Sequence, residues 1–158
     1  MTDMLVNLLK LPARLSLPEE LKSRGVNVRR AQTFEISPVR EFVLENFEPG
    51  WADEILVGFT QKPVTVFIAT ESRRVLGFAA YECTRRNFFG PMGVAKKMRG
   101  LGIGRALLLA CLEAMREMGY VYAIIGGVGP TEFYERTAGA RVIPESEPGI
   151  YTDILRRK

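Results

Sequence analysis

Two hydrophobic periodicities alternate along this chain and predict its strands and helices. Apolar residues that alternate with polar ones, or that form short β-branched and aromatic runs, indicate strands, and apolar residues three or four apart indicate helices. The predicted strands span residues 26–31, 64–70, 75–84, 88–94, 120–125, 141–144 and 150–155. The predicted helices span residues 37–46, 51–59, 102–118 and 130–138. The last two strands are expected to form a hairpin.

Two of these elements carry signals beyond their periodicity. The helix at 102–118 has a continuous apolar stripe, which indicates that one face packs on a core. The stripe consists of Ile103, Leu107, Ala110, Cys111, Ala114 and Met118. The strand at 88–94 contains Gly90, Pro91 and Gly93, which weaken ladder pairing and predict a bulge or a splayed edge.

This order of elements predicts a mixed sheet covered by helices. No repeat, low-complexity tract or linker divides residues 26–158, so we expect one domain there. Residues 1–25 are expected to form a short amphipathic arm. They do not resemble a signal peptide, because Asn7 and Lys10 interrupt the apolar residues and Asp3 replaces the usual basic region. The arm could cover a substrate cleft or cross to the second subunit of a homodimer.

The composition removes several classes of function. The chain has no histidine, which excludes a Ser-His-Asp triad, a histidine base and a histidine-ligated metal site, and we expect no metal cofactor. Cys83 and Cys111 are too far apart for a C-x-x-C motif, and we expect both to be reduced and buried, as in a cytoplasmic protein. The longest apolar run, 106–112, is too short to span a membrane. A net charge of +4 is too small to indicate a nucleic-acid-binding protein.

Segment 94–105 joins a predicted strand to the N-terminus of the long helix and contains Gly100, Gly102 and Gly104. Glycines leave backbone amides uncovered, and the helix dipole adds partial positive charge at this end. The cations that flank these amides are Lys96, Lys97, Arg99 and Arg105. The segment is therefore predicted to bind a pyrophosphate.

Two common phosphate-binding motifs do not match this segment. A Walker A loop needs a Gly-Lys pair, which occurs nowhere in the chain. A Rossmann fingerprint needs a third glycine or alanine where this chain has Leu107 or Arg105. It also needs an acidic residue at the end of the next strand, where Gly126 and Gly127 stand.

The motif R-x-x-G-x-G, from Arg99 to Gly104, resembles the coenzyme A loop of the GNAT superfamily, the acyl-CoA-dependent N-acetyltransferases. The preceding strand with Met92 and Val94, and the order of elements from residue 26 onward, are also similar to that family. The sequence 133–136, Phe-Tyr-Glu-Arg, looks like its late F-Y-E-K helix. The resemblance implies an α/β fold of the α+β type. Its sheet would be mixed and mostly antiparallel, with six to seven strands, about four flanking helices, and a splay where the cofactor inserts.

The resemblance also implies a cosubstrate, acetyl-CoA, and the groups that act on it. Backbone N–H groups near Met92 and Val94 would polarise the thioester carbonyl. Tyr134 would be the general acid, because a phenol with a pKa of ~10 stays protonated at neutral pH and can donate to the leaving thiolate. The implied cofactor-binding residues are Met92, Gly93, Val94, Arg99, Gly100, Leu101, Gly102, Ile103, Gly104 and Arg105.

The general base is less well defined by the sequence. Without histidine, a carboxylate or a chain of water molecules must take the proton. Glu82 is the first candidate, because a carboxylate in a predicted central strand is seldom placed there without a purpose. It could equally face solvent or pair with Arg85 or Arg86. Glu132 and Glu54 are weaker candidates.

Negative charge gathers in residues 35–54, which contain six acids and one base, Arg40. By resemblance, the helices of this stretch form the acceptor side of the cleft, where acids would attract a cationic amine. Trp51 could stack on a sugar, cover an amine or anchor the core, and Glu54 lies near it in sequence. The compact chain favours a small-molecule acceptor and direct transfer in a ternary complex. An amino sugar such as glucosamine is the first hypothesis.

Other functions stay open at this point. A protein-lysine or polyamine acetyltransferase would use the same chemistry on another amine. A non-catalytic acyl-CoA-binding or regulatory module would keep the fold and the cofactor without turnover. Enzyme and module both predict acetyl-CoA binding that a bulky residue at Gly104 weakens. Only an enzyme predicts CoA release that Tyr134→Phe reduces.

Overall fold

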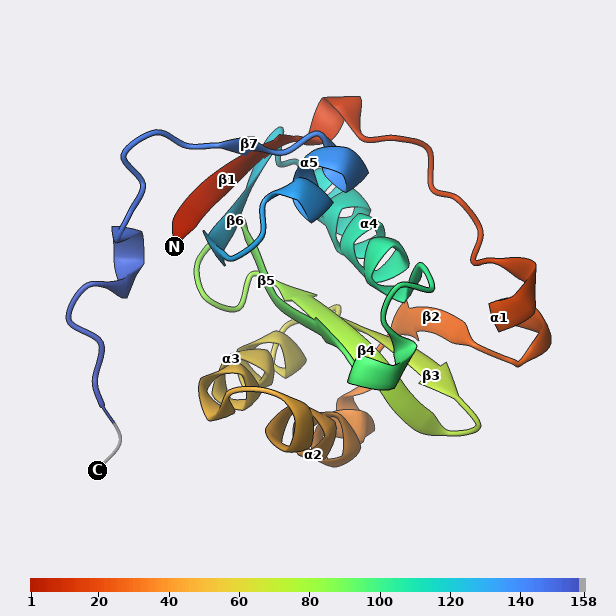
Figure 1. Ribbon diagram of the computed structural model, residues 1–158. Helices are drawn as coiled ribbons and strands as arrows, with labels where there is room; N and C mark the ends of the chain where they lie inside the picture. The colour runs from red at the N-terminus through yellow and green to blue at the C-terminus, as the bar shows by residue number, and fades with distance from the viewer. Residues whose placement is uncertain (157–158) are drawn as a thin grey trace.

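The fold is a seven-stranded sheet in the order β2-β3-β4-β5-β6-β1-β7, described for residues 1–156 by a computed structural model (Figure 1). The strands are β1 (Thr2–Asn7), β2 (Asn27–Arg30), β3 (Val66–Glu71), β4 (Arg74–Tyr81), β5 (Phe88–Val94), β6 (Tyr122–Val128) and β7 (Arg141–Val142). The helices are α1 (Glu19–Ser23), α2 (Ile36–Asn46), α3 (Pro49–Phe59), α4 (Ile103–Glu117) and α5 (Glu132–Ala138). Neighbouring strands are antiparallel except β5 and β6, which are parallel. The predicted fold class is confirmed.

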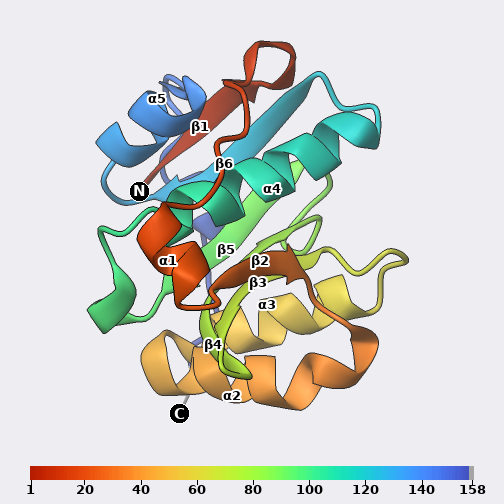
Figure 2. The same cartoon turned by 90° about the vertical axis from the view of Figure 1, so that its right-hand side faces the viewer.

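Helices cover both faces of the sheet (Figures 1 and 2). On one face α2 and α3 bury Val39, Val43 and Ile55, in one apolar cluster with Phe78 of β4. On the other face α4 buries its predicted stripe, except for Met118, which lies beyond the helix and is exposed. Burial on both faces explains why β4 is apolar at nearly every position from 76 to 81. Within the described residues, no helix is long and apolar enough to cross a bilayer.

The sheet splays between β5 and β6. Two pairs join these strands, Phe88 with Ile124 and Phe89 with Ile125, and the strands part beyond them. On its other side β5 has a register shift, at which Gly90 and Pro91 together face one residue of β4. Proline has no N–H to donate to the ladder, so the bulge forms where the sequence predicts it.

The expectation of an arm at residues 1–25 is wrong for its first residues. Thr2–Asn7 form β1, which pairs with β6 on one side and with β7 on the other. The alternate residues Met4, Val6 and Leu8 are each 0% exposed. An apolar residue between them, Leu5, is partly exposed and hides this alternation in the sequence. The start of the chain is therefore part of the sheet.

The expected C-terminal hairpin is also wrong. Arg141–Val142 pair with β1, and Gly149–Tyr151 form a 3₁₀ turn instead of a partner strand. The strand predicted at 120–125 continues through Gly126 and Gly127. Those two residues face Asp3 of β1 at a second bulge, and the Asp3 carboxylate accepts the Gly127 N–H at 2.9 Å. Glycine is tolerated in this strand because a neighbouring carboxylate satisfies the displaced amide.

Candidate active site

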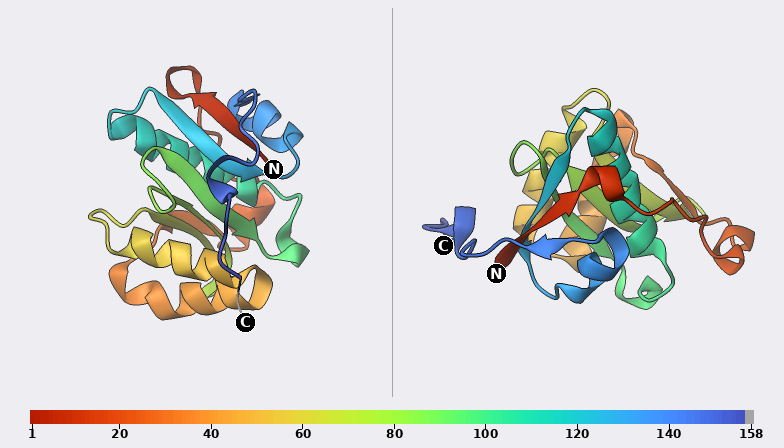
Figure 3. Two further views of the ribbon diagram at one scale, coloured as in Figure 1. Left: turned by 90° about the vertical axis from the view of Figure 1, so that its left-hand side faces the viewer. Right: turned by 90° about the horizontal axis from the view of Figure 1, so that it is seen from above.

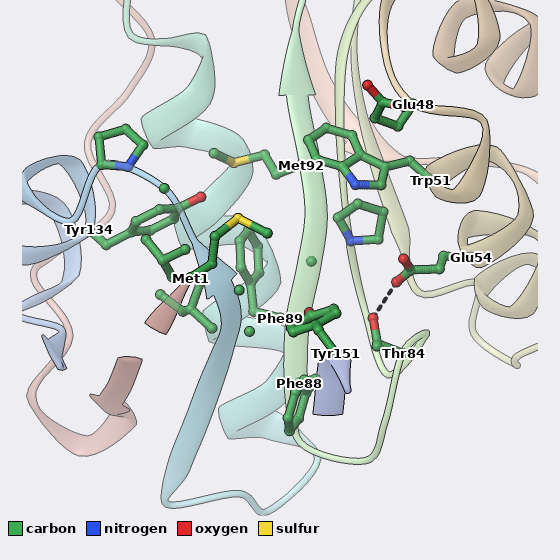
Figure 4. Close-up of a pocket in the computed structure, with 18 of the residues that line it drawn as sticks. Met1, Glu48, Trp51, Glu54, Thr84, Phe88, Phe89, Met92, Tyr134 and Tyr151 are labelled. Atoms are coloured by element: carbon green, nitrogen blue, oxygen red, sulfur yellow. Dashed lines mark hydrogen bonds between the residues drawn. The ribbon is translucent and has the colours of Figure 1, made fainter. Parts of the chain in front are cut away.

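A cavity of ≈ 590 Å³ opens where β5 and β6 part (Figure 4). Trp51 and Glu54 line it from α3, and Thr84 lines it from the loop that follows β4. Tyr134 of α5 lines it from the other side, and Tyr151 of the C-terminal segment lies near Thr84 (Figure 4). A cavity at which elements from the whole chain converge is the default candidate for an active site.

Strand β5 turns two backbone N–H groups towards the gap. The Ala95 N–H donates to the Leu76 carbonyl at 2.8 Å, which fixes the phase of the β4–β5 ladder. In that phase Met92 and Val94 belong to non-hydrogen-bonded pairs, so their N–H groups point away from β4. They face the side from which β6 has parted, where they are free to donate to a substrate oxygen.

Tyr134 is held rigidly with its hydroxyl in the cavity. Its ring packs edge-on against Phe89 and Phe133, at centroid distances of 6.4 and 5.0 Å. Figure 4 shows the hydroxyl pointing into the cavity, and no hydrogen bond within residues 1–156 occupies it. Burial raises the pKa of Tyr134 above its ordinary value of 10.0. The phenol therefore keeps its proton at neutral pH and is free to donate it.

The predicted phosphate loop lies at the N-terminus of α4, outside the cavity. Gly100 and Gly102 have φ angles of +78° and +95°, which L side chains rarely adopt. Within residues 1–156 no side chain caps α4 at Gly102, so the N–H groups of its first turn lack a capping partner there. The buried Nε of Arg105 also has no hydrogen-bond acceptor within residues 1–156. Free amides beside an unpartnered guanidinium nitrogen fit the pyrophosphate of coenzyme A.

Some predicted cofactor-binding residues have a folding role in the structure. Arg99 donates its Nε to the Val94 carbonyl at 3.0 Å, which ties the glycine loop to the end of β5. Ile103 is 1% exposed and belongs to the core beneath α4. Gly93 faces Phe47, and a Cβ built on Gly93 would lie 2.4 Å from that ring.

The other two predicted loop residues have space around them. Leu101 is exposed between Gly100 and Gly102. A Cβ on Gly104 would lie 3.7 Å from Phe133 and 3.7 Å from Val94, which is ordinary contact. Gly104 is therefore not required by packing, in contrast to Gly93.

Glu82, the first candidate for the general base, does not line the cavity. It follows the end of β4 with a φ of +60°, and its Oε1 accepts the Asn87 N–H at 2.5 Å. Its own N–H donates to the Phe88 carbonyl at 2.9 Å. The predicted strand 75–84 ends at Tyr81, so Glu82 is in the turn to β5 and organises that turn. Glu132, on α5, is also absent from the cavity lining.

Two carboxylates of the acidic stretch do line the cavity. Glu48, at the N-cap of α3, and Glu54, two turns later, lie on either side of Trp51 (Figure 4). Glu54 accepts a hydrogen bond from the Thr84 hydroxyl through Oε2, and its Oε1 stays available. Glu35, in contrast, pairs with Arg29 at 2.6 Å, and this ion pair lowers the pKa of Glu35.

Trp51 combines the two roles that the sequence leaves open. It lines the cavity, and its ring stacks on Phe47 at 5.3 Å and meets Phe78 edge-on at 6.3 Å. Its position in the cavity wall is therefore fixed by the aromatic cluster behind it.

Sequence reasoning missed Thr84, Phe88 and Tyr151 as site residues. Tyr151 reaches the cavity because the C-terminal segment runs along one side of the molecule, from the α5 end towards α3 (Figure 3). Its ring packs on Gly126 and Gly127, and a Cβ on Gly127 would lie 2.8 Å from that ring. No local pattern around residue 151 indicates this contact, because it depends on the partner glycines being far away in the sequence.

Residues 62–137 match the family model of the Acetyltransferase (GNAT) domain. This range includes β5, the glycine loop, α4 and Tyr134. No curated protein matches the sequence.

Solved structures share the fold at low sequence identity. A GCN5-related N-acetyltransferase from Sphaerobacter thermophilus has a TM-score of 0.69 at 21% identity, over 90% of this chain and 48% of that chain. A glucosamine N-acetyltransferase region of a fungal multi-domain GH3 β-N-acetylglucosaminidase has a TM-score of 0.67 at 16% identity, over 90% of this chain and 19% of that chain. A GNAT family acetyltransferase from Brucella melitensis, in complex with acetyl-CoA, has a TM-score of 0.57 at 18% identity, over 76% of this chain and 88% of that chain. This chain spans about half or less of the first two.

The splayed sheet, its parallel β5–β6 pair and the uncapped glycine loop are features of the mixed α/β fold that the sequence predicts. The match over 62–137 makes the assignment more specific: this segment matches the acetyltransferase (GNAT) domain, and the chain shares the fold of GNAT N-acetyltransferases.

Proposed function

We propose that this domain transfers the acetyl group of acetyl-CoA directly to a primary amine of a small molecule. The observation that carries the proposal is the cavity itself. It brings together the outward N–H group of Met92, the protonated phenol of Tyr134 and the carboxylate of Glu54, and the outward N–H group of Val94 follows along β5. These are the three groups that aminolysis of a thioester needs.

In this mechanism the glycine loop and Arg105 hold the pyrophosphate, and β5 holds the pantetheine arm. The N–H groups of Met92 and Val94 stabilise negative charge on the thioester oxygen. The amine nitrogen forms a bond to the carbonyl carbon, and the carbon–sulfur bond breaks. Tyr134 gives its proton to the departing thiolate, and Glu54 accepts the proton that the amine loses.

Glu54 replaces Glu82 as the proposed base. Its Oε1 is available in the cavity, because the bond from Thr84 uses Oε2. That bond fixes the carboxylate rotamer, which aims the free oxygen without a histidine. The Glu54 charge attracts an ammonium ion, which gives its first proton to solvent, and Glu54 then accepts the proton that the neutral amine loses on attack.

An amino sugar such as glucosamine, the acceptor that the sequence favours, presents the primary amine that this chemistry needs. Polyamines and protein lysines present one as well. Thiol release from acetyl-CoA with a panel of amines distinguishes an enzyme from a non-catalytic acyl-CoA-binding module. Acetyl-CoA binding without CoA release from any amine would favour the module.

Tyr134→Phe tests the proposed general acid. We expect kcat to fall about 10²-fold, because the thiolate loses its proton donor, while the KM for acetyl-CoA stays unchanged. Tyr122→Phe is the matched control, since Tyr122 is 48% exposed on β6 and does not line the cavity. Full kcat in Tyr134→Phe would remove Tyr134 from the mechanism.

A further inference from the structure

The charged side chains that line the cavity, among the described residues, are both acidic. They are Glu48 and Glu54, and no lysine or arginine side chain belongs to the lining. Met1 also lines the cavity, and its N-terminal ammonium group pairs with Glu147. An ammonium group of the acceptor is therefore attracted by Glu48 and Glu54, whereas a second group with negative charge on the same acceptor would be repelled by them and would compete with Glu147 for the ammonium group of Met1.

Most of the remaining wall is aromatic or aliphatic. The rings that line the cavity are those of Trp51, Phe88, Phe89, Phe133, Tyr134 and Tyr151. Few neutral side chains offer hydrogen bonds: the Thr84 hydroxyl already donates to Glu54, and the other hydroxyl groups of the lining are those of Tyr134 and Tyr151. A polyhydroxylated acceptor would leave hydroxyl groups without partners here, which costs binding free energy.

Tyr151 is held firmly enough to act as a wall. Its ring packs on the glycines of β6, which have no side chains to displace it. The segment before it is fixed to β1, because the Asp3 N–H donates to Ser146 Oγ at 2.9 Å and the Ile143 N–H donates to the Asp3 carbonyl at 2.9 Å. Burial and the nearby carboxylates raise the pKa of Tyr151, so its hydroxyl stays neutral.

We propose that the acceptor is a primary amine on an apolar, ring-bearing body without an acidic group, and that Tyr151 is the specificity residue against which this body packs. The inference rests on the proposed function and narrows its acceptor. The aromatic ring of such an acceptor gains binding free energy by packing on the apolar walls, and its ammonium group gains it by attraction to Glu48 and Glu54. An aromatic amino acid adds a carboxylate that Glu48 and Glu54 repel, and an amino sugar has no aromatic ring to pack on the apolar walls.

Three amines test this acceptor class in the thiol-release assay with the full chain. 2-Phenylethylamine combines a ring with an amine, phenylalanine adds a carboxylate to the same body, and glucosamine replaces the ring by a polyol. We expect kcat/KM for 2-phenylethylamine to exceed that for each of the others by about tenfold or more. Equal or better turnover of phenylalanine or glucosamine overturns the inference and leaves the proposed function intact. CoA release from no amine overturns both.

Variants of two wall residues test the physical causes. Glu48→Gln should reduce the preference for 2-phenylethylamine over phenylalanine by about fivefold, because Glu48 is exposed and its charge is partly screened. Glu45→Gln on α2 makes the same charge change away from the cavity and should leave the preference unchanged. An equal effect of both variants would contradict a local role for Glu48.

Tyr151→Leu should raise the KM for 2-phenylethylamine about tenfold, with the KM for acetyl-CoA unchanged, because the ring that packs on the acceptor is lost. Tyr151→Phe keeps the ring and should restore the wild-type KM for the amine. Parallel increases in both KM values, or no rescue by phenylalanine, would show that Tyr151 supports the fold and does not contact the acceptor.

Discussion

Gly93 shows how one residue connects the core to the site. It lies on β5 between the two residues whose N–H groups point away from β4, and Phe47 of the aromatic cluster occupies the place of its side chain. Phe47 in turn stacks on Trp51, which lines the cavity. A change at Gly93 therefore reaches the cavity wall through Phe47.

Gly93→Ala should lower the free energy of unfolding by about 1–3 kcal/mol, because the added methyl group displaces a buried ring. Urea denaturation measures this change. Gly50→Ala is the control: a Cβ at Gly50 meets nothing within 4 Å, and alanine in helix α3 should be neutral or stabilising by up to about 1 kcal/mol. Equal stability of both variants would mean that Phe47 moves aside at little cost.

At the scale of elements, helix α4 has a positive-φ glycine at each end. Gly102 precedes its first turn with a φ of +95°, and Gly119 follows its last turn with a φ of +102°. Neither is crowded: a Cβ on Gly102 would lie 3.6 Å from Pro18, and one on Gly119 would meet nothing within 4 Å. The two positions therefore differ mainly in their proposed function: the free N–H groups near Gly102 would bind the pyrophosphate, and no ligand is proposed near Gly119.

Alanine at either position should cost about 1–2 kcal/mol of stability, because both backbones are left-handed. Gly102→Ala should also weaken acetyl-CoA binding about tenfold, since amides that face the pyrophosphate are displaced. Gly119→Ala should leave that affinity unchanged. Isothermal titration with acetyl-CoA measures both, and equal affinities in the two variants would contradict a phosphate site at this loop.

The elements predicted well from the sequence are those with local signals. Helix α4 has its own apolar stripe, and β5 has its proline and glycines, so each was placed within about one residue. Strand β1 was missed because its alternation is short and becomes meaningful only when β6 and β7 lie beside it. The position of Glu82 is predicted wrongly because a strand's end depends on its partner strand, and β4 ends at Tyr81, three residues before the predicted end at residue 84.

The same distinction applies to the candidate site. The glycine loop and Tyr134 lie within short motifs, so sequence reasoning found them. Thr84 and Tyr151 have no motif, and the fold brings them together with Glu54 from three distant segments. Contacts of this kind depend on the assembled sheet, which no local pattern specifies.

At the scale of the whole molecule, the sheet separates two apolar clusters, one under α4 and one under α2 and α3. Each cluster contains one free cysteine, Cys111 in the first and Cys83 in the second, and both are buried. Burial raises the pKa of Cys83 to about 11, from 9.0, and raises that of Cys111 as well. Each of the two apolar clusters therefore contains one thiol whose pKa is raised by burial, so ionisation of the thiols at high pH affects the stability of both clusters.

Both thiols are protonated in the folded protein at pH values where the unfolded chain already loses the protons. The folded state then binds more protons than the unfolded state, so stability is complete below pH 9 and falls as the pH rises towards 11. Each thiol contributes at most about 1.4 kcal/mol per pH unit. Urea denaturation at steps from pH 8 to 10 should show this fall in the free energy of unfolding, and Cys83→Ala should reduce the slope of that fall by about half.

A free energy of unfolding that stays constant over this pH range, or a slope that Cys83→Ala leaves unchanged, would contradict proton linkage through the buried thiols. Above pH 10 the buried Tyr81 and the partly buried Tyr134 and Tyr151, whose pKa values are also raised, should lower the stability further.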